Sequence, residues 1–71
     1  MFTLSRFELK RKIHEINPHL VITFRIKDNE DYICINNKEY NLEKFNNKNE
    51  DCLARDILSF YVNDVPYANG L

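Results

Sequence analysis

The chain has 71 residues, a hydrophobic fraction of 44% and a formal net charge of −1. This length predicts one small domain over residues 1–71, with its core within residues 3–62 and a C-terminal tail over residues 63–71. No apolar run reaches the roughly 18 residues that a membrane-spanning helix needs, so we expect no membrane partner. Residues 1–6 lack the pattern of a signal peptide, and the two cysteines have no disulfide-framework spacing, which predicts a cytoplasmic protein.

The charge divides along the chain. Residues 1–27 carry six Lys or Arg and two Asp or Glu, a net charge of +4, whereas residues 28–71 carry four and nine, a net charge of −5. Asn, Ile and Lys are common and glycine occurs once, a bias typical of AT-rich genomes. We therefore expect a bacterial or phage source.

A helix is predicted over residues 3–16. Ser5 and Glu8 have the spacing of a capping box, in which each side chain accepts from the other residue's backbone N–H. Pro18 ends the helix because proline disfavours helical geometry in the residue before it. The apolar stripe expected to face the core consists of Phe2, Leu9, Ile13 and Ile16.

Three strands follow, over residues 20–27, 32–35 and 39–43, joined by polar turns at 28–31 and 36–38. The first strand alternates at period two, which predicts that one face of it packs inward through Leu20, Ile22, Phe24 and Ile26. The short connections predict an antiparallel meander.

A second helix is predicted after the Asn-rich loop at residues 46–49, whose side chains are suited to capping a helix. It starts near Glu50 and carries a broad apolar arc formed by Leu53, Ala54, Ile57, Leu58, Phe60 and Tyr61. The predicted fold class is therefore α+β, a two-layer sandwich in the order helix, three-stranded antiparallel meander, helix.

Residues for catalysis are scarce. His14 and His19 are the only histidines, and the single glycine, Gly70, excludes a glycine-rich phosphate-binding loop. Cys34 and Cys52 are too far apart in sequence to form a local metal-binding pair. We expect no enzyme activity, no metal site and no cofactor.

The outer side of the first helix is the leading candidate for a binding surface. The residues predicted to bind a partner are Phe7, Lys10, Arg11 and His14, extended across the sheet by Arg25 and Lys27. An aromatic among cations suits an acidic patch on a larger protein or a nucleic-acid backbone. A second, acidic surface is held in reserve and consists of Glu30, Asp31, Glu50 and Asp51.

The layout over residues 3–62 resembles the double-stranded-RNA-binding domain in topology. That family binds RNA through a basic start to its second helix, where this chain has Glu50 and Asp51 instead. The layout also resembles small phage-encoded inhibitors of bacterial defence nucleases, including certain anti-CRISPR proteins, which implies a single domain without catalytic residues.

We therefore expect a non-catalytic protein-binding domain, for example a stoichiometric inhibitor of a nucleic-acid enzyme such as a defence nuclease. One alternative is a small nucleic-acid-binding module that uses the basic first helix. Another is a structural homodimer that forms through Leu4, Phe7 or the Pro66-Tyr67 segment.

Overall fold

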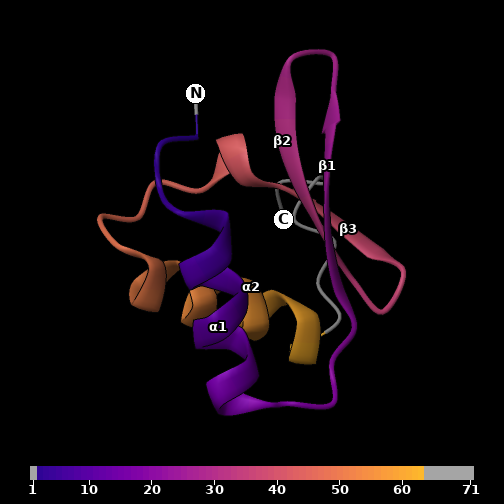
Figure 1. Ribbon diagram of the computed structural model, residues 1–71, viewed down its shortest axis with the longest axis vertical. Coiled ribbons are helices and arrows are strands. Elements are labelled where there is room, and N and C mark those ends of the chain that lie inside the picture. Colours follow the sequence, from indigo (N-terminus) through magenta and orange to yellow (C-terminus); the bar gives the residue numbers. More distant parts are fainter. Residues whose placement is uncertain (1, 64–71) are drawn as a thin grey trace.

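Two helices pack on one face of a three-stranded antiparallel sheet in the computed structural model, which describes residues 2–63 (Figure 1). The elements in chain order are α1 (Arg6–Ile16), β1 (Ile22–Lys27), β2 (Glu30–Ile35), β3 (Lys38–Asn41), the 3₁₀ helix η1 (Leu42–Lys44) and α2 (Glu50–Asn63). The strand order in the sheet is β1-β2-β3. The predicted α+β fold is thus confirmed, and residues 64–71 of the predicted tail lie outside the described residues. No helix within the described range is long and apolar enough to cross a membrane.

Half of the predicted capping box forms at the start of α1. The Ser5 hydroxyl accepts a hydrogen bond from the Glu8 N–H at 3.2 Å, as predicted. The return contact differs, because the Ser5 N–H donates to Glu50 Oε2 at 2.7 Å while the Glu8 carboxylate binds Arg11. The helix begins at Arg6 rather than at residue 3, and the start of α1 is joined directly to the start of α2.

Two-residue turns join the three strands. The backbone φ is positive at Asp28 (53°), Asn29 (64°), Asn36 (47°) and Asn37 (75°). Asp and Asn tolerate this left-handed conformation, and two such residues in a row match the twist of an antiparallel hairpin. The first predicted turn was too long, because β2 already begins at Glu30, directly after these two residues.

The end of the third predicted strand was also wrong. β3 stops at Asn41, and residues 42–44 form η1 instead of extended chain. The Asn41 side chain accepts a hydrogen bond from the Glu43 N–H at 2.8 Å, which starts this turn. A polar side chain that can cap the next segment therefore ends the strand locally.

The Asn-rich loop caps α2 as predicted. Asn49 Oδ1 accepts a hydrogen bond from the Cys52 N–H at 2.9 Å. The predicted apolar arc of this helix also faces the core, with Leu53, Ala54, Ile57 and Leu58 buried and the two aromatic residues of the arc packed against them.

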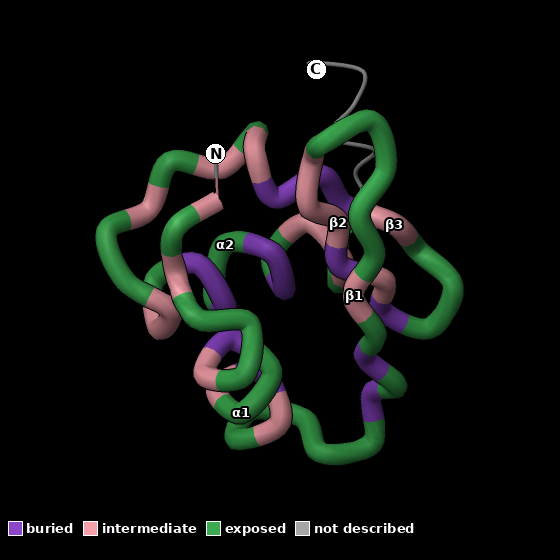
Figure 2. The backbone as a smooth tube through the Cα atoms, turned by 45° about the horizontal axis from the view of Figure 1, so that its top comes forward, coloured by how far each residue is buried: buried purple, intermediate pink, exposed green. Residues whose placement is uncertain are grey.

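One hydrophobic core fills the space between the helices and the sheet, and the buried residues face this space (Figure 2). Its buried side chains are Leu9, Ile13, Leu20, Ile22, Ile33, Ile35, Tyr40, Leu42, Leu53, Ala54, Ile57 and Leu58. The prediction that Ile16 is buried was wrong, since this residue ends α1 beyond the core and is 56% exposed. Leu4, predicted on the outside, is half-buried and packs against the core.

Ile13 and Ile16 offer a matched test of where this core ends. We expect Ile13→Ala to lower the free energy of unfolding by about 2–5 kcal/mol, because Ile13 is fully buried and its loss leaves a cavity. Ile16→Ala should change it by less than about 1 kcal/mol. Urea denaturation of both variants checks this, and equal losses would contradict the observed boundary.

Candidate protein-docking surface

Two contacts join α1 to the β1–β2 hairpin, one to β2 and one to the residues just before β1. Near the start of the helix, Arg6 Nη1 donates to Asp31 Oδ1 at 2.8 Å, and Asp31 is the cross-strand partner of Ile26. Near its end, His14 Nε2 lies 2.8 Å from the Leu20 carbonyl oxygen, which only accepts, so Nε2 carries the hydrogen. Helix and strand run in opposite directions, and a gap separates their backbones (Figure 1).

Phe7 and Lys10 lie on this same flank of α1. Residues three or four positions apart share a helix side, which places Lys10 one turn from Arg6 and one turn from His14. Phe7 is 76% exposed, and no ion-pair partner for Lys10 occurs in the part of the chain that the structure describes. Two of the predicted residues thus present an aromatic ring and a cation beside β1, while His14 is engaged in holding the chain.

Arg11 forms ion pairs with two residues of its own helix. Its Nε lies 2.5 Å from Glu8 Oε1, and its Nη1 lies 2.5 Å from Glu15 Oε2. The hydrogen bond to Arg11 lowers the pKa of Glu8, and the same pairing raises the pKa of Arg11. The positive charge predicted for this side of α1 is therefore shared with two carboxylates.

Arg25 and Lys27 lie on the outer face of the sheet, opposite the helices. Lys27 Nζ is 2.6 Å from Glu39 Oε1 and 4.8 Å from the centre of the Tyr32 ring. Its hydrogen bond to Glu39 raises the pKa of Lys27. Arg25 Nη1 lies 3.9 Å from Glu39 Oε2, and its side chain is 62% exposed. The fold therefore keeps Lys27 apart from the flank that carries Lys10, whereas Arg25 also borders a hollow beside Arg6.

The reserve acidic residues fall on two sides of the start of α1. Asp31 binds Arg6, and Glu50 accepts from the Ser5 N–H. The other two acids have partners nearby. Glu30 Oε1 accepts from Asn41 Nδ2 at 2.9 Å within the sheet, and Asp51 Oδ2 lies 3.5 Å from Arg55 Nε within α2. All four carboxylates have an internal partner, which reduces the charge that this surface offers.

The far end of β1 contributes residues that sequence reasoning assigned to the core. Arg6, Phe24, Arg25 and Ile26 line an open hollow of about 370 Å³. Ile26 is 67% exposed and Phe24 is half-buried, although the sequence predicts both to pack inward. Their side chains point to the predicted face, but the helices do not extend far enough to cover it. Both residues come shortly before a two-residue turn, and this position in the sequence could have predicted that they lie near the exposed end of the hairpin.

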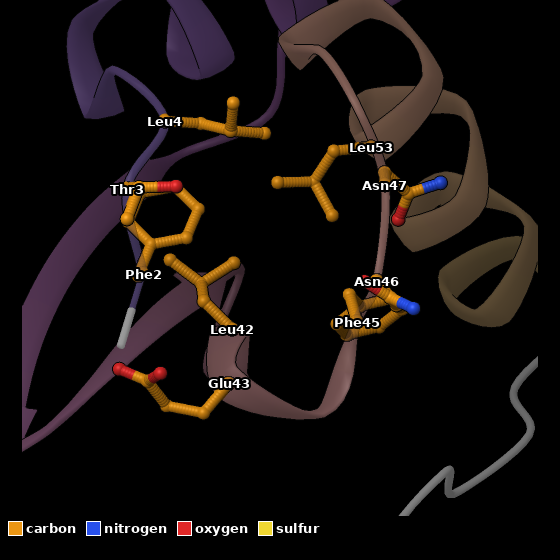
Figure 3. Close-up of a pocket in the computed structure, with 9 residues that line it drawn as sticks. All are labelled: Phe2, Thr3, Leu4, Leu42, Glu43, Phe45, Asn46, Asn47 and Leu53. Carbon is orange, nitrogen blue, oxygen red and sulfur yellow. The ribbon is translucent and has the colours of Figure 1, made fainter.

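A second hollow, of about 250 Å³, lies between the N-terminal segment, η1 and the start of α2 (Figure 3). Leu42 and Leu53 lie toward its middle, and Glu43 lies at one side (Figure 3). The Asp31 N–H donates to Glu43 at 3.2 Å and lowers the pKa of that carboxyl. No histidine or cysteine lines this hollow, and residues 2–63 contain no group of three or more His, Cys, Asp or Glu placed to hold a metal ion.

No protein-family model, curated protein or solved structure matches this chain significantly. The two resemblances in layout, to the double-stranded-RNA-binding domain and to phage inhibitors of defence nucleases, stay predictions. What can be said of function therefore depends on the geometry of the exposed residues.

Replacing Arg11 by methionine tests the internal pairing on α1. We expect Arg11→Met to raise the pKa of Glu8 toward its ordinary value of 4.5, because the hydrogen bond that lowers it is lost. In the parent protein the folded-state pKa is the lower one, so Glu8 contributes stability above its ordinary pKa and loses it as the pH falls through the folded value. NMR titration of the Glu8 carboxyl carbon measures this shift.

Lys48→Met serves as the matched control, since Lys48 is an exposed cation in the loop before α2. It should leave the titration of Glu8 unchanged. An unaltered Glu8 titration in Arg11→Met would show that Arg11 is free to bind a partner.

Proposed function

We propose that this chain is a non-catalytic protein-binding domain that docks through the side where the start of α1 and the far end of β1 border one open hollow. This α1–β1 surface consists of Arg6, Phe7, Lys10, Phe24 and Ile26. The observation that supports the proposal is the exposure of a large aromatic and a large aliphatic side chain beside cations, on two elements that the fold holds together.

Exposed Phe7 and Ile26 have the character of binding anchors. Burying large apolar side chains supplies most of the free energy at protein interfaces, and arginine and aromatic residues are enriched among the residues that contribute most. Single exposed apolar residues are common on monomers. Here they lie on the flank of α1 and at the end of β1 that Arg6 joins through Asp31, which favours a surface over isolated exposure.

A nucleic-acid-binding role has less support. Affinity for nucleic acid grows with the number of phosphates that free cations neutralise. Arg11 contacts Glu8 and Glu15, and Lys27 contacts Glu39. Few cations of the predicted basic surface therefore remain for phosphate, and we favour a protein partner.

The identity of the partner follows only from the resemblance in layout. On that basis we propose a larger protein, for example a nucleic-acid enzyme such as a defence nuclease, in a bacterial or phage setting. The homodimer alternative loses one of its contacts, since Leu4 packs against the core. Pro66 and Tyr67 lie outside the described residues.

The test is capture of a partner from a low-GC bacterial lysate by the tagged chain, with and without nuclease. We expect a protein that persists after nuclease treatment and that the double variant Phe7→Ala/Lys10→Glu no longer retains, because the aromatic anchor is lost and the charge reversed. Mass spectrometry identifies the retained protein.

The matched control is Val62→Ala/Lys48→Glu, which removes an exposed apolar residue and reverses an exposed lysine away from the α1–β1 surface. It should retain the partner fully. Loss of the partner on nuclease treatment, or equal retention by both double variants, would overturn the proposed function.

A further inference from the structure

β1 has a neighbour on one side only. The sheet order β1-β2-β3 makes it an edge strand, and within residues 2–63 it pairs with β2 alone. Two contacts show which of its backbone groups this pairing uses. The Asn36 N–H donates to the Val21 carbonyl at 3.0 Å, and Lys27 and Glu30 are the paired residues that flank the two-residue turn. Both observations place the hydrogen-bonded pairs at the odd-numbered residues of β1.

The even-numbered residues consequently direct their N–H and C=O groups away from β2. These residues are Ile22, Phe24 and Ile26, evenly spaced along the six-residue strand. An edge of this kind is a template for another strand, and natural proteins usually shorten, bulge, cover or charge it; in β1 the charges are Arg25 and Lys27, which select against most strands. β1 contains no proline, and its register with β2 runs without interruption from Ile22 to Lys27.

The side chains around this edge define what an added strand would meet. On the helix side, such a strand would meet the exposed Ile26, the half-buried Phe24 and the hollow that these residues share with Arg6 of α1. These contacts favour apolar side chains at every second position of the added strand. At the other end of this edge the Leu20 carbonyl already accepts from His14, so the added strand would pair beside residues 22–26 only.

On the outer face of the sheet, an added strand would meet different side chains. Thr23, Arg25 and Lys27 project there, and the exposed Arg25 has only a distant contact with Glu39, at 3.9 Å. Residues directly opposite one another in neighbouring strands interact, and opposite charges stabilise the pair. The remaining positions of an added strand would therefore be acidic. A second copy of β1 lacks this complement, because its own outward positions carry cations.

We propose that an extended segment of the partner, in which apolar and acidic residues alternate, adds to the free edge of β1 as a fourth strand of the sheet. This proposal rests on the protein-binding function and specifies how the α1–β1 surface is used. Main-chain hydrogen bonds to residues 22, 24 and 26 supply affinity, and the two faces of the segment supply specificity.

Ile26→Pro removes the N–H that would pair with the partner and leaves the pairing with β2 intact, because residue 26 does not donate to β2. Ile26→Val keeps the N–H and serves as its control. We would select displayed random peptides of about ten residues on the full chain, then measure the affinity of enriched peptides for each variant. We expect alternating apolar and acidic sequences that bind Ile26→Pro about tenfold more weakly and Ile26→Val equally.

Arg25→Glu provides a second variant that does not alter the backbone. It should disfavour acidic peptides and select sequences with basic residues at the same alternate positions. Selection of no peptide, selection of peptides without alternation, or equal binding to Ile26→Pro would overturn strand addition. Sedimentation showing a dimer that Ile26→Pro disrupts would assign the edge to a second copy and overturn it as well.

The two proposals fail in different ways. If the captured protein is lost with Phe7→Ala/Lys10→Glu but retained by Ile26→Pro, the protein-binding function stands and strand addition is wrong. If no protein survives nuclease treatment, the function itself is wrong.

Discussion

The limited reach of two short helices over one sheet face is the constraint on which the rest of this structure depends. α1 has eleven residues and α2 has fourteen, and together they bury the sheet where Ile22, Ile33 and Ile35 lie. The β1–β2 hairpin continues past this core, so its last apolar residues reach solvent (Figure 2). Within residues 2–63 the helices cover one face of the sheet, and β1 has no neighbour on its second side.

Ion pairs within the fold offset part of the charge division along the chain. The N-terminal cations and the later acids meet in the fold, as Arg6 does with Asp31 and Lys27 does with Glu39. Arg11 is paired within its own helix. Exposed pairs of this kind add little stability, but they neutralise the potential that a basic surface would need to attract phosphate. Among the cations predicted to bind a partner, Lys10 has no ion-pair partner within residues 2–63, and Arg25 has only a distant one.

A free strand edge and an adjoining helix flank form a recognition surface without any catalytic group. The backbone of β1 offers evenly spaced donors and acceptors, and Phe7 and Ile26 offer apolar area to the side chains of an added strand. The contacts of Arg6 with Asp31 and of His14 with Leu20 fix α1 relative to the hairpin. His14 was predicted to bind a partner and supports the site instead, whereas the role of Arg6 was not predicted.

The sequence by itself determined the order of elements, the two turns and the helix caps, because these depend on neighbouring residues. Asn36 and Asn37 accept positive φ, and Ser5 and Asn49 cap helices wherever the rest of the chain lies. Alternation also placed Phe24 and Ile26 on the correct face. Only the tertiary structure decided how far the core extends along that face and which carboxylate each cation meets. Those outcomes depend on where helices of limited length dock on the sheet. The periodicity of apolar residues shows which face of a strand is buried, but it does not show how much of that face a helix covers.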